Sequence, residues 1–411
     1  MQVKYQDLYQ SEAQAQLARY SEIQKGFEEN FGSAEGGEWF SAPGRTEIGG
    51  NHTDHNHGRV LTAAVNLDIV GLAKKTDSQV IRLKSGEYTR LDRVALDDLQ
   101  PRKRESGSQE IIRGICAKCL ELGYKVGGFD CFTLSRVMKG SGLSSSAAFE
   151  ILVVTVISHL FNDGTIDPVT AAIIAQYAEN VYFGKPSGLL DQMASSVGGF
   201  TSIDFKEPTK PVIRQVNFDF ASCGHALCVV DTGGNHSDLT EEYAAIPKEM
   251  KEVAACFGKD FLRDVDERDF YGDLRKLRKT VGDRAVLRAM HFFDDDRLAA
   301  EEANALESGD FTAFKKMIHT SGRSSYERLQ NVFPVTAPRE QGVSLALAVS
   351  EFLLGEDGAY RVHGGGFAGT IQAFVPLEML DQYRETMENI FGEGACHVLT
   401  VRQAGGTKVI R

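Results

Sequence analysis

The chain has 411 residues, of which 42% are hydrophobic and 25% are charged, and its formal net charge is -12. This length favours two domains over a single core, and the composition is that of an ordinary globular protein. The acidic balance argues against general nucleic-acid binding, because phosphate backbones are held by concentrated Lys and Arg. A nucleotide can still bind, since it needs only a local pocket.

No segment predicts a membrane anchor or an exported protein. The longest apolar segment, residues 151–160, is shorter than the roughly 18 to 20 residues that span a bilayer, and the N-terminus lacks the apolar core of a signal peptide. The seven cysteines do not suggest a disulfide framework. We interpret Cys116 and Cys119 as two thiols on one helix rather than as a zinc or redox site. We therefore expect a cytoplasmic monomer or weak oligomer that binds neither nucleic acid nor membrane.

Apolar periodicity predicts the elements of the first half. Residues 4–31 are expected to form a helix, because Leu17, Tyr20 and Ile23 recur at roughly helical spacing. A loop rich in glycine and small residues is expected at 32–58. The elements expected next are strands at 60–70 and 80–83, a helix at 109–122, a strand at 129–137, and helices at 145–160 and 168–181.

A candidate boundary lies at residues 200–211, where the strand-like FTSIDF gives way to the linker-like KEPTKP. We divide the chain there into an N-terminal domain, residues 1–205, and a C-terminal domain, residues 206–411. Strands and helices are expected in both halves, which indicates an α+β fold.

Beyond the boundary, the pattern predicts a strand at 225–231 and polar helices over 240–313. Near the C-terminus Gly364, Gly366 and Gly369 match the dinucleotide-binding pattern GxGxxG. The authentic pattern leads into a helix, whereas the residues that follow here alternate like a strand. We interpret the cluster as a glycine-rich turn that packs against a ligand or another loop.

Residues 139–148, KGSGLSSSAA, form a glycine-rich turn between an expected strand and an expected helix. Several peptide N–H groups converge there with the positive end of the helix dipole, which makes a cradle for phosphate. Its glycines permit close approach of the backbone, and its serines add hydroxyls for phosphate oxygens or Mg²⁺. It lacks the Gly-Lys-Ser/Thr ending of a P-loop. The alternative interpretation is a serine-capped helix start.

Residues 42–58, APGRTEIGGNHTDHNHG, gather glycines, histidines, an Asp and an Arg in one segment. A metal site would use His52, Asp54, His55 and His57, but its ligands would need spacings that project to one point. A solvated polar turn is a further alternative. A polar pocket for a hydroxyl-rich ligand explains the mixture better, because a sugar needs donors and acceptors in a fixed arrangement.

Residues 188–199, GLLDQMASSVGG, follow the helix that carries Glu179. Asp191 lies there between apolar residues, among them Leu190 and Met193. Such an acid is either buried and functional or a helix cap, and the residues alone favour the cap.

Taken in order, these segments resemble those of galactokinases, in the GHMP superfamily of small-molecule kinases. The resemblance covers roughly residues 35–405. The matching motifs are APGR…NHTDHNHGRVL, GFDCFTLSRVMKGSGLSSSAAFE, AENVYFGKPSGLLDQMASSVGG, DTGGNHSDLTEEY and YRVHGGGFAGT. The resemblance implies a two-domain fold whose active site lies between the domains, with ATP as phosphoryl donor, a sugar as acceptor and Mg²⁺ as cofactor.

The resemblance also implies a role for each matching residue. Asp191 is the catalytic carboxylate and Arg45 its charged partner. The other residues are assigned as follows: Asn51, His52, Asp54, Gly188 and Tyr243 to the sugar; Gly140, Ser141, Gly142, Leu143, Ser144, Ser145 and Ser146 to ATP; Ser146 and Glu179 to Mg²⁺.

This assignment makes chemical sense. Phosphoryl transfer depends on positioning and charge neutralisation. A carboxylate can orient a sugar hydroxyl and accept its proton as the bond to phosphorus forms. An Arg beside it keeps the carboxylate ionised and stabilises charge on the transferring group. Asp191 is thus either a base or mainly an electrostatic partner of Arg45.

The chain departs from the family at several positions. Asn51 stands where galactokinases usually carry an acid that receives a sugar hydroxyl, Glu47 stands where Asn is common, and His55 replaces a Tyr. Because Asn carries no charge to repel an anion, galacturonate becomes an alternative substrate to galactose, and arabinose is a related one.

Two other functions compete with a galactose 1-kinase. A catalytically silent sugar sensor would have a damaged phosphate turn, whereas the turn here is complete. A kinase for mevalonate or homoserine would lack the polar NHTDH run.

Overall fold

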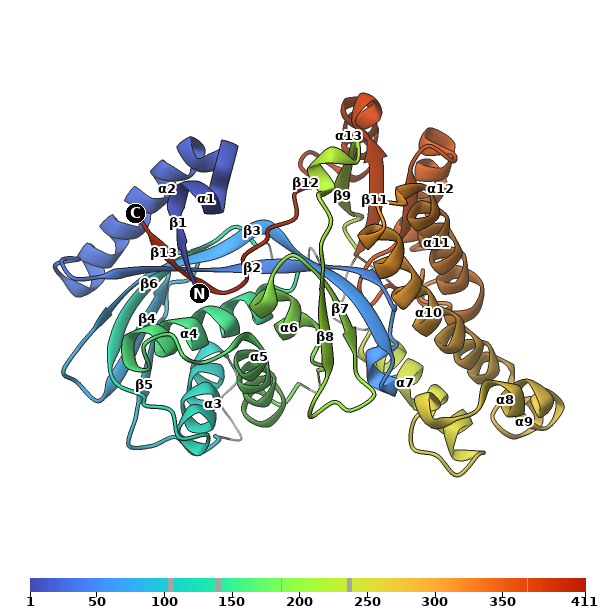
Figure 1. Ribbon diagram of the computed structural model, residues 1–411, viewed down its shortest axis with the longest axis horizontal. Helices are drawn as coiled ribbons and strands as arrows, with labels where there is room; N and C mark the ends of the chain where they lie inside the picture. Colours follow the sequence, from blue (N-terminus) through green and yellow to red (C-terminus); the bar gives the residue numbers. More distant parts are fainter. Residues whose placement is uncertain (103–106, 138–141, 186, 235–238, 368) are drawn as a thin grey trace.

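The computed structural model describes residues 1–102, 107–137, 142–185, 187–234, 239–367 and 369–411. Helices and strands follow one another through both halves of the chain and build two sheets with helices packed on them (Figure 1). The expected α+β fold is confirmed. Among the described residues, no helix combines the length and the apolar character that crossing a membrane requires.

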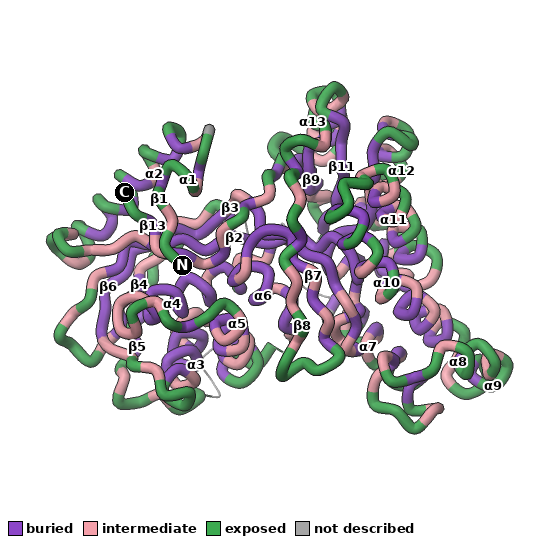
Figure 2. The backbone as a smooth tube through the Cα atoms, viewed as in Figure 1, coloured by how far each residue is buried: buried purple, intermediate pink, exposed green. Residues whose placement is uncertain are grey.

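The larger sheet is organised around two long antiparallel strands, β2 (Glu38–Gly49) and β3 (Arg59–Lys75). The two halves of β3 have different neighbours, since residues 69–75 pair with β6 and residues 59–63 pair with β7. Figure 2 shows that both long strands are buried along most of their length. The remaining strands of this sheet are β1 (Gln2–Lys4), β4 (Val80–Ser85), β5 (Leu91–Ala95), β6 (Phe129–Ser135), β7 (Phe200–Asp204), β8 (Val212–Val216) and β13 (Thr407–Ile410).

The expectation of one loop over residues 32–58 is wrong for β2. Its glycines, proline and polar residues hide the strand in the sequence, but it lies between β3 and β13 and is hydrogen-bonded to both. Its pairing with β3 shifts register between Pro43 and Arg45 and again between Glu47 and Gly49. Such irregularities re-aim side chains and are common beside functional sites.

Helices cover the larger sheet and make most of its core. One of them, α4 (Ser145–Phe161), is apolar on nearly all sides and packs against β2 and β3. The others are α2 (Ala13–Phe31), α3 (Ser108–Glu121), α5 (Pro168–Tyr177) and α6 (Leu190–Val197). The expected helix at 145–160 is confirmed, whereas the one at 168–181 changes into a π-helical turn at Ala178–Phe183.

The smaller sheet is fully antiparallel and has the order β10–β11–β9–β12. Its strands are β9 (His225–Asp231), β10 (Ala359–Val362), β11 (Thr370–Pro376) and β12 (Cys396–Leu399). The helices of this half are α7 (Thr240–Ala255), α8 (Glu267–Gly272), α9 (Leu274–Thr280), α10 (Asp283–Glu307), α11 (Phe311–Ser324), α12 (Gly342–Leu354) and α13 (Leu380–Phe391). The helix α10 also packs on β2 and β3, so it connects this half to the larger sheet (Figure 1).

The segment expected to be a linker, residues 206–211, is the turn of a hairpin. Strands β7 and β8 pair antiparallel on either side of it, and both belong to the larger sheet. The last strand of the chain, β13, also returns to that sheet and pairs with β1 and β2. The division at residues 205 and 206 stays a prediction, and a cut there would separate β8 and β13 from their partners.

A buried carboxylate joins both ends of the chain to β3. Asp68 is fully buried and accepts hydrogen bonds from Arg19 (2.6 Å), Tyr9 (2.9 Å) and Arg402 (3.0 Å). Burial alone would raise the pKa of Asp68, but the two guanidinium groups lower it below its ordinary value. The Asp68 carboxylate therefore links α2, through Arg19, and the C-terminal segment, through Arg402, to β3.

Replacing Asp68 by Asn should destabilise the protein by about 3–5 kcal/mol, because Arg19 and Arg402 lose their counter-charge in a buried site. The measurement is the free energy of unfolding in urea, with Asp381→Asn as control, since the Asp381 side chain is 96% exposed. A lowered carboxyl pKa contributes stability above the pKa of the unfolded chain and loses it as pH falls. The difference between wild type and Asp68→Asn should therefore shrink below about pH 4. A loss under about 1 kcal/mol at pH 7 would contradict this role.

Candidate active site

The two residues expected to carry catalysis meet in the structure. Arg45 lies on β2 and Asp191 in the first turn of α6, and Arg45 Nε donates to Asp191 Oδ1 at 2.7 Å. Ser144 donates to the other oxygen of Asp191 at 2.6 Å. The Asp191 side chain nevertheless keeps 33% of its surface exposed. It is held in place on one side and open to a ligand on the other.

The charge of Asp191 is set by its neighbours. Burial acts to raise the pKa of this carboxyl, but the charge and hydrogen bond of Arg45 and the hydrogen bond of Ser144 lower it below the ordinary value. Asp191 is therefore ionised at neutral pH. Because Arg45 is buried, its charge is poorly screened by water and acts strongly on this carboxylate.

The described part of the phosphate turn lies against this pair. The carbonyl of Leu143 accepts a hydrogen bond from the Arg45 peptide N–H at 3.0 Å, and the carbonyl of Gly142 accepts one from the Arg45 guanidinium at 2.5 Å. Gly142 has a φ of +71°, and a Cβ there would lie 2.7 Å from Thr370 Oγ1. Glycine is thus required for both backbone conformation and space. Gly140 and Ser141 lie outside the described residues.

The turn leads directly into α4, where Ser145 and Ser146 occupy the first helical turn. Ser144 precedes the helix but makes no side-chain capping bond, because its hydroxyl is directed to Asp191. The helix-cap interpretation is therefore wrong for Ser144. The N-terminus of α4, which Ser144 does not cap, presents peptide N–H groups and a partial positive charge, which suit a phosphate.

The residues expected to bind sugar come from the turn between β2 and β3 and from the segment before α6. A Cβ on Gly188 would lie 2.0 Å from Asp54 Oδ2, so glycine is needed for the carboxylate of Asp54 to lie there. His52 hydrogen-bonds through Nε2 to the carbonyl of Gly365 at 3.0 Å, and burial lowers its pKa to about 4. His52 is therefore neutral at pH 7 and donates from Nε2, which leaves Nδ1 as an acceptor.

Tyr243 enters from α7 and packs on the C-terminal glycine cluster. Its hydroxyl donates to the carbonyl of Gly366 at 2.9 Å, and its ring lies where a Cβ on Gly365 would be. This cluster connects β10 to β11 and contacts the turn that carries His52. The interpretation of GxGxxG as a turn that packs against another loop is confirmed by these contacts.

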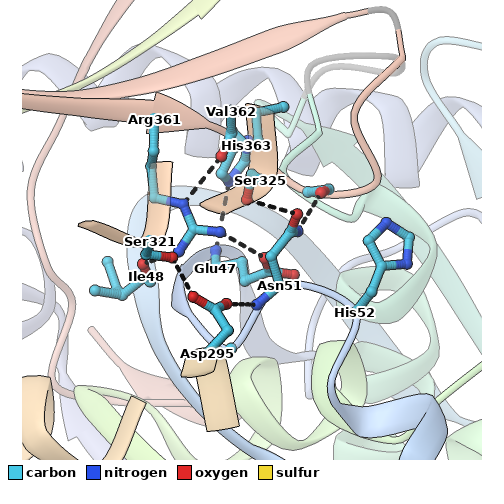
Figure 3. Close-up of polar contacts among 12 residues, drawn as sticks. Glu47, Ile48, Asn51, His52, Asp295, Ser321, Ser325, Arg361, Val362 and His363 are labelled. Atoms are coloured by element: carbon cyan, nitrogen blue, oxygen red, sulfur yellow. Dashed lines mark hydrogen bonds and ion pairs between the residues drawn. The ribbon is translucent and has the colours of Figure 1, made fainter. Parts of the chain in front are cut away.

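Asn51 differs from the other expected sugar residues. It is fully buried, its peptide N–H donates to Asp295 on α10 at 2.6 Å, and its carbonyl oxygen lies 3.0 Å from His291 Nε2. Its side chain bonds only to other protein groups (Figure 3). A direct contact of Asn51 with sugar is therefore not supported, because the amide has no surface to offer.

Glu179, expected to bind metal, lies in a cluster of acids beside α4. Its carboxylate accepts from Lys185 at 2.9 Å and from Gln192 at 2.8 Å, and Gln192 also donates to Glu150 at 3.0 Å. Glu150 is four residues after Ser146, on the same side of the helix. Among the described residues, no group of three or more His, Cys, Asp and Glu is arranged to hold a metal ion.

Sequence reasoning missed several groups at this site. Lys185 is close enough to Glu179, Asp191 and Glu150 for each to raise its pKa. His363, just before the glycine cluster, lies 3.0 Å from Thr46 and is kept neutral because burial lowers its pKa to about 3. A signal was available, since both residues lie inside motifs that carry the family resemblance, AENVYFGKPSGLLDQMASSVGG and YRVHGGGFAGT.

Comparisons with known proteins identify the family and the fold. Residues 25–75 match the galactokinase galactose-binding signature, and residues 110–199 match the N-terminal domain of GHMP kinases. Galactokinase of Streptomyces coelicolor is 32% identical over 372 residues, which cover 89% of this chain and 91% of that protein. In fold, the chain is similar to Lactococcus lactis galactokinase complexed with galactose (TM-score 0.81, 22% identity, 95% and 100% of the two chains). It is also similar to Methanococcus jannaschii mevalonate kinase (TM-score 0.62, 14% identity, 89% and 99%).

The fold and the site together define a GHMP small-molecule kinase, whose fold is similar to that of a galactokinase and of a mevalonate kinase. Within this class, the 32% sequence identity to a galactokinase, over most of both chains, shows the family. The chain belongs to the galactokinase family, whose members transfer a phosphate to a sugar hydroxyl.

Proposed function

We propose that the protein transfers the γ-phosphoryl group of ATP to the anomeric hydroxyl of galactose, giving galactose 1-phosphate and ADP. The observation that carries this proposal is the 2.7 Å ion pair between Arg45 and Asp191 at the N-terminus of α4. It joins an ionised carboxylate, a fixed cation and a helix terminus suited to phosphate in one place. Use of ATP leads us to propose a cytoplasmic location, and a monomer or weak oligomer stays a prediction.

In this proposal Asp191 orients the acceptor hydroxyl. A carboxylate whose pKa is lowered is a weak base, so it holds the hydroxyl by a charge-assisted hydrogen bond before reaction. The hydroxyl becomes acidic only as its oxygen bonds to phosphorus, and Asp191 accepts the proton at that stage. Arg45 keeps the carboxylate ionised and balances charge on the transferring group.

We assign sugar binding to His52, Asp54, Gly188 and Tyr243. Asp54 presents an acceptor beside Gly188, and the neutral ring of His52 offers Nδ1 while its Nε2–H is held by Gly365. Such fixed donors and acceptors are what a hydroxyl-rich ligand requires.

We assign Mg²⁺ to Ser146 and Glu179. Hydroxyl and carboxylate oxygens suit this ion, and Glu150 Oε1 beside them is buried without a hydrogen bond to a described residue. When bound, Mg²⁺ neutralises charge on the β- and γ-phosphates. Lys185 occupies one oxygen of Glu179 in the structure, so it holds that carboxylate in place.

The site favours a neutral sugar over galacturonate. The absence of an acid at position 51 does not leave the region without carboxylates. Glu47, Asp54 and Asp191 are all close enough to Arg45 to act to raise its pKa. A substrate carboxylate would be repelled by them.

A coupled ADP-release assay over galactose, galacturonate and arabinose tests the substrate. We expect the highest kcat/KM with galactose. Preference for the uronic acid would overturn the choice of sugar, and absence of ADP release with every sugar would favour the silent sensor.

Replacing Asp191 by Asn should lower kcat by about 10³-fold or more, because the charge that orients and deprotonates the hydroxyl is lost. The variant should also be less stable, because the buried Arg45 guanidinium loses its counter-charge, so kcat is measured well below the unfolding midpoint of the variant. Asp381→Asn, on the exposed surface, is the matched control and should keep full activity. A kcat within tenfold of wild type would be incompatible with the role given to Asp191.

Replacing Gly188 by Ala should raise the KM for galactose about 10- to 100-fold, because the added methyl group displaces the Asp54 carboxylate. The KM for ATP should not change. Gly272→Ala is the control, since a Cβ there meets no atom within 4 Å. An unchanged KM for galactose would show that Asp54 does not contribute to sugar binding.

A further inference from the structure

Two positions at which the chain departs from the family signature are in direct contact. Asn51 Nδ2 donates to Glu47 Oε1 at 2.7 Å. Relative to the common pattern, the acid and the amide have exchanged places. The exchange keeps a carboxylate and an amide in the same cluster but moves the carboxylate onto β2 (Figure 3).

The amide of Asn51 has no capacity left for a ligand. Its two donors are used by Glu47 and by the carbonyl of Gly364, both at 2.7 Å. Its oxygen accepts from Asn331 at 2.8 Å and lies 3.5 Å from Ser325 Oγ. With a fully buried side chain, this residue can act on a sugar only through another group.

Glu47, by contrast, is nearly buried but retains bonding capacity. Its side chain is 10% exposed, and Oε1 lies 3.7 Å from Arg361, beyond hydrogen-bond distance. The other oxygen has no hydrogen bond to any residue that the structure describes. A carboxylate has about four acceptor positions, so Glu47 can receive a further donor.

The strand directs Glu47 toward the catalytic pair. Pairing of β2 with β3 is regular from Arg45 to Glu47, so these two side chains leave the strand on the same face. The Arg45 guanidinium on that face contacts Asp191. Arg45 acts to lower the pKa of Glu47 and Asp54 acts to raise it. The Glu47 carboxylate is therefore within electrostatic reach of the proposed sugar site.

We propose that Glu47 accepts a hydrogen bond from a sugar hydroxyl and determines sugar specificity, and that Asn51 is the residue that positions it. This inference rests on the proposed function, since it names a further contact within the same site. Asn51 holds one oxygen of Glu47 and thereby directs the other toward the ligand.

The charges around Glu47 are consistent with this role. Burial raises its pKa to about 7, against the lowering effect of Arg361, Arg45 and the Asn51 hydrogen bond. Asp54 also raises it, and Glu302 on α10 is a further acid close to it, while the neutral His363 lies at its peptide N–H. At neutral pH the Glu47 carboxyl is therefore only partly ionised, and it is the ionised form that accepts a hydroxyl.

The first test is Glu47→Gln, which keeps the shape and removes the charge. We expect the KM for galactose to rise about 10- to 100-fold, with little change in kcat or in the KM for ATP. Singly deoxygenated galactoses then locate the contact. For one of them, and only one, Glu47→Gln should cause no further loss, because the hydroxyl that it served is already absent.

The second test restores the common order with the double variant Glu47→Asn, Asn51→Glu. Asn51→Glu alone should weaken galactose binding, because it faces Glu47 with a second carboxylate, and the double variant should recover most of the loss. If the role of Glu47 were purely structural, Glu47→Gln would lower the melting temperature and would raise the KM of every deoxy sugar by the same factor. If Glu47→Gln does not fold, Glu47→Asp, which keeps the charge but shortens the side chain, carries the same comparison.

The results separate two failures. If wild type phosphorylates galactose and Glu47→Gln leaves its KM within twofold, the inference about Glu47 is wrong while the proposed function stands. If wild type phosphorylates no sugar, the proposed function itself fails.

Discussion

The arrangement of the site depends on a buried cation. Arg45 contacts Asp191 through its guanidinium, the carbonyl of Gly142 through the same group, and the carbonyl of Leu143 through its peptide N–H. One residue therefore holds the proposed catalytic carboxylate and the glycine-rich turn at a fixed separation. Because Arg45 is shielded from water, its charge also keeps Asp191 ionised although that carboxyl is partly desolvated.

The two long strands connect the surroundings of Arg45 to the other half of the molecule. At one end β3 pairs with β6, and at the other with β7, while α10 packs on both β2 and β3 from the opposite half. The turn between β2 and β3 is held from α10 by Asp295 and His291. The segment proposed to bind sugar is thus supported by rigid elements on both sides, which suits precise placement of a substrate.

Sequence reasoning identified the chemistry more reliably than the local structure. The meeting of Arg45 and Asp191, 146 positions apart in sequence, follows from the resemblance and is found in the structure. The strand β2 was missed, because its glycines and polar residues carry no alternating pattern, and long-range pairing with β3 and β13 overrides that weak preference. Ser144 was assigned to phosphate, but whether it caps a helix or contacts Asp191 depends on a side-chain direction that spacing does not encode.

By itself the sequence determined the class of enzyme and the set of reactive groups, because glycines, serines, acids and an arginine at these spacings define a chemistry before they define a shape. Only the tertiary structure decided which groups remain available to a ligand. Asn51 and Glu47 are both polar and lie four residues apart, yet Asn51 has used its hydrogen-bonding capacity on its neighbours, whereas Glu47 bonds through only one carboxylate oxygen among the described residues. Whether a side chain keeps hydrogen-bonding capacity for a ligand depends on how distant elements pack around it. A local sequence pattern does not contain that information.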